Sequence, residues 1–227
     1  MLSIKNLTKS YGDNEVLKDF SLGIEEHLIT CILGKSGSGK TTLLNILSSL
    51  IDEYKGDVTD FRDKSFSYIF QESRLISWYD VYRNLEFVMH KKDDNAIMKC
   101  LKMVDMEAYT ASYPSELSGG MAQRVSIARA FLEKSDILLM DEPFKGLDPT
   151  QKNDIVERFM QLWKEDKRTV VYVTHDIDEA LYIGNDIVII GEKPAKVIYN
   201  KKNVDMLNDD GVLKEKEKIW QILRSQM

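Results

Sequence analysis

One segment of the chain has glycines, a lysine and a threonine at the spacing of a phosphate-binding loop. Gly34, Gly39, Lys40 and Thr41 match G-x-x-x-x-G-K-[ST], directly after the apolar run Leu28–Leu33. The glycines let the chain curl so that backbone N–H groups point at a phosphate, and a helix beginning near Lys40 adds the positive end of its dipole. We expect the lysine to reach the β- and γ-phosphates of a nucleotide and the Thr41 hydroxyl to ligate Mg²⁺. Further candidates for nucleotide binding in this segment are Ser36, Gly37 and Thr42.

A second segment ends in two carboxylates. The hydrophobic run Ile137–Met140 is followed by Asp141 and Glu142. A strand of this kind places Asp141 at its carboxyl end, where it can hold the Mg²⁺ shell, while Glu142 projects differently and can polarise an attacking water. General-base assistance contributes about 10²–10⁴-fold, so loss of Glu142 should stall hydrolysis and spare binding. The alternative is an acidic pair that merely ends a strand.

A third segment, Leu117–Met121, reads Leu-Ser-Gly-Gly-Met. Ser118, Gly119 and Gly120 can open a helix and present donors to an anion, or they can form a simple glycine turn that caps a helix. With the other two segments, this one resembles the signature sequence of the ATP-binding cassette ATPases. Gln123–Val125 and Ala128–Ala130 follow it as that family usually has them.

The resemblance covers nearly the whole chain and implies a mechanism. In that family the signature sequence contacts the γ-phosphate bound by the opposite subunit, so one chain cannot complete its own site. The resemblance therefore implies a homodimer that forms head to tail on ATP binding, with ATP and Mg²⁺ as cofactors. Ordinary P-loop kinases and GTPases lack the signature sequence.

The same resemblance assigns roles to isolated residues. Tyr11 resembles the aromatic residue that stacks on adenine, and Gln71 the glutamine that senses Mg²⁺ and the attacking water. Asp148 resembles the aspartate of the loop that carries communication across the dimer. His175 resembles the histidine that holds the γ-phosphate and positions the water with Glu142. Without the family, a lone Tyr or His would be interpreted as structural.

The chain departs from the family pattern at two places. Met121 replaces the commoner Gln at the end of the signature, and Lys145-Gly146 stands where Gly-Ala is more usual. Neither is expected to touch a phosphate, so we expect activity to be retained and dimer communication to be tuned at most.

The elements that must position these residues are strands alternating with helices, which predicts a mostly parallel sheet covered on both faces. Expected strands are Leu28–Leu33, Ser65–Phe70, Asp136–Met140, Thr169–Thr174 and Asp186–Ile190. Expected helices are Thr41–Leu50, one that opens at Pro149 after an Asp148 cap, Ile177–Ile183 and a terminal helix within Val204–Met227. Alternation at Leu2–Leu7 and Val16–Ile24 predicts antiparallel strands, and the pattern turns helical from Glu72 to Glu133.

The predicted fold is therefore α/β: a P-loop NTPase core, an N-terminal antiparallel β subdomain and an inserted helical subdomain. We expect a single domain over residues 1–227, with the nucleotide-binding core at 1–71 and 135–227. The insert at 72–134 would carry the signature sequence.

Composition narrows the function classes. The 227 residues carry a net charge of −6, which argues against nucleic acid as a partner. No run of about 18 apolar residues exists and no signal-peptide pattern begins the chain, so a cytosolic protein is expected. The cysteines, Cys31 and Cys100, are expected to be structural free thiols.

A single small cassette of this kind resembles the ATPase subunit of a bacterial importer at the cytoplasmic face of the membrane. Gln71–Trp78 and Met140–Phe144 resemble the nitrate/sulfonate/taurine and thiamine-precursor importer group. In that group a membrane permease docks after the Q-loop, and a solute-binding protein is an indirect partner. The candidate docking residues are Arg74, Leu75, Ile76 and Trp78. Alternatively, Leu75 and Trp78 pack the helical insert.

Other functions remain open at this point. An exporter or cell-division-type complex would show the same motifs, and a soluble ATPase outside transport would need a basic surface. A scaffold without activity is disfavoured because Lys40, Asp141, Glu142 and His175 are all present.

Overall fold

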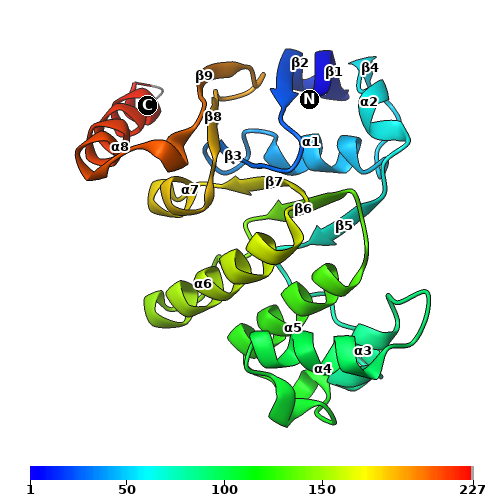
Figure 1. Cartoon of the computed structure of the whole chain (residues 1–227). Helices are drawn as coiled ribbons and strands as arrows, with labels where there is room; N and C mark the ends of the chain where they lie inside the picture. Colours follow the sequence, from blue (N-terminus) through cyan, green and yellow to red (C-terminus); the bar gives the residue numbers. More distant parts are fainter. Residues whose placement is uncertain (226–227) are drawn as a thin grey trace. The chain divides into compact units, whose positions relative to one another are not determined.

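The computed structural model describes residues 1–225, so residues 226 and 227 of the predicted domain and terminal helix lie outside the described residues. The chain forms two compact units (Figure 1). The first comprises Met1–Phe66 and the chain from Arg168 onward, and the second comprises Ser67–Lys167. The limits predicted for the helical insert, 72–134, stay a prediction. Among residues 1–225, no helix has the length and apolar character needed to cross a membrane.

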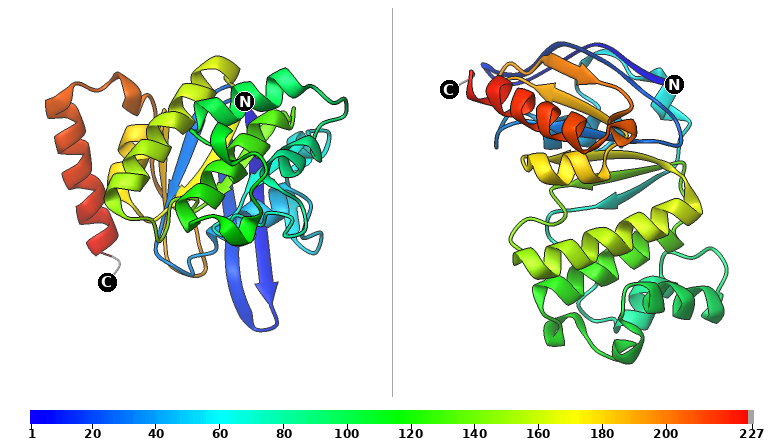
Figure 2. Two further views of the ribbon diagram at one scale, coloured as in Figure 1. Left: turned by 90° about the horizontal axis from the view of Figure 1, so that it is seen from below. Right: turned by 60° about the vertical axis from the view of Figure 1, so that its left-hand side comes forward.

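The first unit begins with a small antiparallel sheet of order β2-β1-β4, which matches the predicted N-terminal subdomain. Strands β1 (Leu2–Tyr11) and β2 (Asn14–Ile24) form a long hairpin, drawn in dark blue in the left-hand view of Figure 2. Gly12 turns it at φ +56°, a conformation that glycine adopts without strain. The short strand β4 (Lys55–Asp57) is exposed throughout, so the sequence has no hydrophobic alternation there that would predict a strand.

The second sheet of the first unit holds β7 (Thr169–Thr174), β3 (Ile29–Leu33), β8 (Asp186–Ile190) and β9 (Val197–Lys201), in that order. Strand β3 pairs in parallel with both β7 and β8. Every residue of these three strands is buried, as their continuous apolar runs require. Strand β9 pairs antiparallel with β8.

Four helices belong to the first unit: α1 (Lys40–Leu47), α2 (Thr59–Arg62), α7 (Ile177–Ile183) and α8 (Asp209–Arg224). Helix α7 packs on β3 and β7, and α8 packs on α7 (Figure 1). Ile219 of α8 is completely buried, as expected for a terminal helix that packs on the core. Trp220 lies on the outer side of α8, with 46% of its surface exposed.

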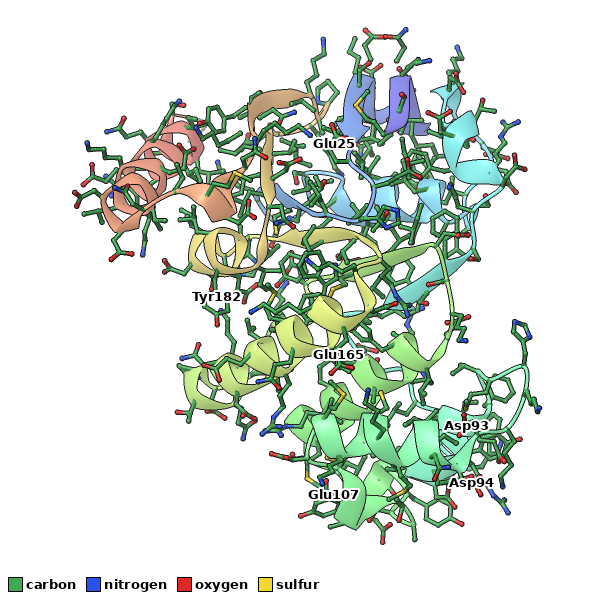
Figure 3. All side chains as sticks on the ribbon, viewed as in Figure 1. Glu25, Asp93, Asp94, Glu107, Glu165 and Tyr182 are labelled. Atoms are coloured by element: carbon green, nitrogen blue, oxygen red, sulfur yellow. The ribbon has the colours of Figure 1, made fainter. Side chains whose placement is uncertain are left out.

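The second unit holds the neighbouring strands β5 (Phe66–Ile69) and β6 (Ile137–Asp141). Its helices are α3 (Val81–Glu86), α4 (Asp94–Met103), α5 (Gly119–Leu132) and α6 (Pro149–Asp166). Helices α3 and α4 pack against α5, and α5 lies beside α6 (Figure 2, right). Side chains of Asp80, Asp93, Ser118 and Asp148 cap their amino ends; Asp93 is labelled in Figure 3.

The α/β fold class is confirmed, with its mostly parallel sheet, antiparallel N-terminal sheet and helical subdomain. The helical pattern was expected from Glu72, but the first helix begins only at Val81. The residues between are held as a loop by a buried asparagine, Asn84, which is described below.

Candidate functional site

The glycine-rich segment forms a loop between β3 and α1. Gly37 and Gly39 have φ of +80° and +104°, values that let the backbone curl back on itself. A Cβ at Gly39 would lie 2.9 Å from Val16 Cγ1, so a larger residue would clash there. A Cβ at Gly37 would meet nothing within 4 Å. The loop is therefore packed on the β2 strand at one glycine and open at the other.

Lys40 is the first residue of α1 and is buried, with 4% of its surface exposed. Its ammonium donates hydrogen bonds to the carbonyl oxygens of Gly34 at 2.7 Å and Lys35 at 2.9 Å. The loop thus folds around this cation. The N-cap residue Gly39 makes no side-chain hydrogen bond to α1, whose first N–H groups are suited to an anion.

Ser38 lies in the same loop. It was not predicted as a site residue, because it occupies a variable position of the motif. It is 3% exposed, and its Oγ has no hydrogen-bond partner among the described residues. Leaving a buried hydroxyl unsatisfied costs about 1–3 kcal/mol. A phosphate oxygen in the loop would satisfy it, so the residues present fit a nucleotide phosphate.

The register of the parallel sheet places His175 beside this loop. Leu33 of β3 pairs with Thr174 of β7, so Gly34 and His175 leave the same edge of the sheet from neighbouring strands. His175 is exposed and directly precedes Asp176, the N-cap of α7. The sheet thus sets a histidine next to the phosphate loop.

A buried carboxylate fixes the turn that carries His175. Glu179 of α7 is 8% exposed and accepts hydrogen bonds from the Tyr172 hydroxyl at 2.5 Å and from Thr174 Oγ1 at 2.8 Å. Thr174 Oγ1 in turn accepts from the backbone N–H of Asp176 at 3.0 Å. Burial and the charge of Glu179 raise the pKa of Tyr172, which stays a donor at neutral pH.

Tyr11 ends strand β1 and keeps 49% of its surface exposed. The Lys9 ammonium lies 4.8 Å from the centre of its ring, a cation–π contact, and donates to the Glu53 carbonyl at 2.6 Å. The ring is therefore held by a buried lysine and retains exposed surface, as stacking on a base requires.

In the second unit, the starts of β5 and β6 are tied by a 2.5 Å contact between Ser67 Oγ and Ser135 Oγ. Because the two strands start side by side, their carboxyl ends lie at one edge, where β6 ends at Asp141 and Gln71 follows shortly after β5. Burial raises the pKa of Tyr68 on β5, and the charge of Asp141 adds to the effect. A carboxylate and an amide side chain are thus brought to the same edge, where they could hold a divalent cation.

Glu142 follows with φ +44°, a left-handed conformation that is rare for a residue with a side chain and is found at functional sites. It is 7% exposed, and its Oε2 lies 2.8 Å from the ammonium of Lys145. In the sequence, Lys145 was noted only as a departure from the family pattern.

The signature segment forms the amino end of α5. Ser118 is the N-cap, and its Oγ accepts from the Met121 N–H at 3.2 Å. A Cβ at Gly120 would lie 2.6 Å from Gln151 Oε1 and 3.9 Å from Leu147 Cδ2. The signature turn therefore contacts the segment around Asp148.

Asp148 caps α6 by accepting from the N–H groups of Thr150 and Gln151, both at 3.1 Å. A hollow of about 240 Å³ opens beside the signature turn, with Ser118, Gly120 and Arg124 in its wall. Gln151, which no motif singled out, is thus the link between the two segments expected to act across a dimer.

The structure assembles the predicted residues in two sets, one in each unit. The first unit holds Tyr11, Gly34, Ser36, Gly37, Gly39, Lys40, Thr41, Thr42 and His175. The second holds Gln71, Ser118, Gly119, Gly120, Asp141, Glu142 and Asp148.

Comparisons with known proteins identify the family of the chain. Residues 17–145 match the family model described as ABC transporter. The chain is 37% identical over 202 residues to the aliphatic sulfonates import ATP-binding protein of Bacillus cereus (strain ZK / E33L), covering 85% of this chain and 80% of that protein. The Bacillus subtilis (strain 168) protein of the same name is 38% identical over 194 residues, covering 81% and 76% of the two chains.

Solved structures of cassettes are also similar. One, described as a dimeric post-hydrolysis state of the ATP-binding cassette MJ0796 bound to ADP and Pi, aligns with a TM-score of 0.74 at 33% identity. The alignment covers 89% of this chain and 98% of that one. The family model matches more than half of the sequence. The phosphate loop surrounds the ammonium of Lys40, and the Ser38 hydroxyl in it has no partner among the described residues. This chain therefore belongs to the ABC transporter family, as an ATP-binding, ATP-hydrolysing cassette.

Proposed function

We propose that this chain is the ATPase subunit of an importer of the bacterial type: it binds Mg·ATP at a head-to-tail dimer interface and drives a separate membrane permease. The observation that carries the proposal is the signature turn of the second unit, a helix start with Gly120 against Gln151, in a chain that also has a phosphate loop. The names of the relatives as import ATP-binding proteins and the dimeric cassette MJ0796 support it.

The roles proposed for the first unit are those that the family resemblance implies, and its geometry is compatible with them. The loop with Gly34, Ser36, Gly37 and Gly39 surrounds the phosphates with N–H donors, Lys40 neutralises them, and Thr42 adds a hydroxyl. Tyr11 stacks on the adenine, and His175 reaches the γ-phosphate from the neighbouring strand end.

Mg²⁺, held by Thr41, Gln71 and Asp141, would neutralise charge on the phosphates when bound. Glu142 accepts a proton from the attacking water, which turns the water into a nucleophile. Ser118, Gly119 and Gly120 of the opposite subunit donate to the γ-phosphate, and Asp148 responds to the same interface through its cap on α6. Loss of the γ-phosphate removes the shared contacts and opens the dimer.

We assign permease docking to the loop that precedes α3. Trp78 is 73% exposed and Phe87 64% exposed, with the Tyr79 ring between them at 6.3 and 6.1 Å. Leu75 and Ile76 are half-buried beside them, and Arg74 lies over the Phe70 ring at 3.8 Å. Exposed aromatic rings in a cluster are typical of protein contact sites.

The loop is rigid enough to present these rings because its backbone is bound on the inside. Asn84 is completely buried; its Oδ1 accepts from the Ile76 N–H, and its Nδ2 donates to the carbonyls of Ile76, Tyr79 and Asp80 at 3.0–3.1 Å. Arg129 of α5 holds the preceding residues by donating to the carbonyls of Ser73 and Arg74. Burial lowers the pKa of Arg129.

Recovery of the tagged chain from its native membranes tests the transport assignment. The wild type should recover a membrane protein with several helices, and a solute-binding protein with it. Trp78→Ala should lose that protein, while Trp220→Ala, which removes an exposed Trp of α8, should keep it. Recovery of soluble proteins or nucleic acid alone would overturn the transport role, and retention by Trp78→Ala would move the docking site elsewhere.

A further inference from the structure

The turn that follows Glu142 points a lysine back at this carboxylate. The Lys145 N–H donates to the Glu142 carbonyl at 3.1 Å, which closes a four-residue turn with Pro143 at its second position. Phe144 is 1% exposed and packs against the Phe159 ring of α6, so the turn is anchored. The return of Lys145 toward Glu142 is therefore set by the backbone.

The side chains of Lys145 and Glu142 form an ion pair across this turn. The Lys145 ammonium lies 2.8 Å from Glu142 Oε2; the Glu142 side chain is 9% exposed and that of Lys145 is 39% exposed. The carboxylate is thus enclosed, whereas the lysine reaches it from the solvent side and can leave. One of the two carboxylate oxygens is occupied by a donor that takes no part in hydrolysis.

We infer that Lys145 acts on the reaction through Glu142, as a positioning residue whose ion pair competes with the attacking water for the carboxylate. The inference rests on the proposed role of Glu142 as the general base. A base must turn a free lone pair toward the water from which it takes a proton. Because the ammonium competes for one carboxylate oxygen, the pair slows turnover without touching the nucleotide.

The lysine is a departure from the family pattern noted in the sequence. The resemblance drawn from the sequence has glycine at this position, so the ion pair is an addition to the common pattern. The Lys145 side chain is 39% exposed, so it can turn away from Glu142 into solvent.

Steady-state hydrolysis of Mg·ATP tests the inference with three variants. Lys145→Met keeps the length of the stem and removes the charge, and should raise kcat by roughly two- to fivefold, the range expected for opening a half-exposed ion pair. KM for ATP should stay within twofold. Lys145→Arg keeps the pair and should keep the wild-type kcat. Lys99→Met, which breaks an exposed pair with Glu165 (labelled in Figure 3) at 2.9 Å, should change nothing.

A kcat for Lys145→Met equal to or below that of the wild type would overturn the inference, as would an equal rise in Lys145→Arg. Thermal unfolding of each variant shows whether folding is intact, and Lys145→Gln gives a second neutral side chain if the methionine variant is unstable. Glu142→Gln separates the two levels of the argument. If Glu142→Gln still turns over at the wild-type rate, the proposed base is wrong; if it is inactive and Lys145→Met shows no rise, only the role of Lys145 is wrong.

Discussion

The buried hydroxyl of Ser38 allows a direct test of whether the phosphate loop is built to bind a nucleotide. Its Oγ has no partner among the described residues and only 3% of the residue is exposed. Leaving such a hydroxyl unsatisfied costs about 1–3 kcal/mol in the nucleotide-free chain. Ser38→Ala removes that cost, so the free energy of unfolding should rise by about 1 kcal/mol and Tm by about 2–4 °C for a chain of this size.

The same substitution should weaken nucleotide binding. A hydrogen bond to a charged group contributes about 1.5–3 kcal/mol, so the affinity for ATP should fall by roughly ten- to a hundredfold. A variant that is more stable when empty and poorer at binding is the signature of a group kept for its ligand.

Two measurements check the prediction: thermal unfolding without nucleotide, and calorimetric titration with a non-hydrolysable ATP analogue. Thr30→Val is the matched control. Thr30 is completely buried at the amino-terminal part of β3, and its Oγ1 also has no partner among the described residues. It should gain stability similarly and bind the analogue as the wild type does. Unchanged affinity in Ser38→Ala, or a loss of Tm without nucleotide, would refute the reasoning.

Two more predictions concern the supports of the site. Glu179→Leu removes the acceptor shared by the Tyr172 and Thr174 hydroxyls and should lower the free energy of unfolding in urea by about 2–4 kcal/mol. Tyr172→Phe removes one of the two hydrogen bonds and should lower it by less. A larger loss in Tyr172→Phe than in Glu179→Leu would contradict the network. In the second unit, burial alone would raise the pKa of Asp154, but the hydrogen bond from Arg158 and the charge of Arg124 outweigh it and lower that pKa. Because the folded pKa lies below the unfolded one, this contribution is present above about pH 4 and is lost as pH falls through the folded pKa. The urea midpoint of the wild type should therefore fall more steeply between about pH 5 and pH 2 than that of Asp154→Asn; equal slopes would contradict the assignment.

The sequence predicted the elements whose residues are buried in a regular pattern. The expected ranges for β7, α7 and β8 agree with the structure residue for residue. Strands β7 and β8 are mostly apolar segments of strand length, as buried parallel strands are. The segment between Glu72 and Val81 was predicted to be helical because the stretch from Glu72 to Glu133 has few β-branched runs, but Asn84 binds carbonyl groups of this segment and holds it as a loop. A side chain acting at that distance leaves no periodicity in the sequence.

The motifs predicted the candidate site residues, but the residues that support them could be identified only in the structure. The loop motif predicted Lys40, but it could not show that Ser38 is buried without a partner, since burial depends on the packing of the whole loop. Lys145 stood out only as a departure from the family pattern. Its contact with Glu142 depends on the turn, which a sequence does not display.

Light scattering of the Glu142→Gln chain with Mg·ATP tests whether two chains share their nucleotides. We expect the mass of one chain without ATP and of two chains with it, because this variant still binds ATP and its γ-phosphate is not hydrolysed. Adding Ser118→Arg should return the mass to that of one chain, because a bulky cation would block the signature turn. A Glu142→Gln chain that keeps the mass of one chain at saturating ATP would contradict the shared site.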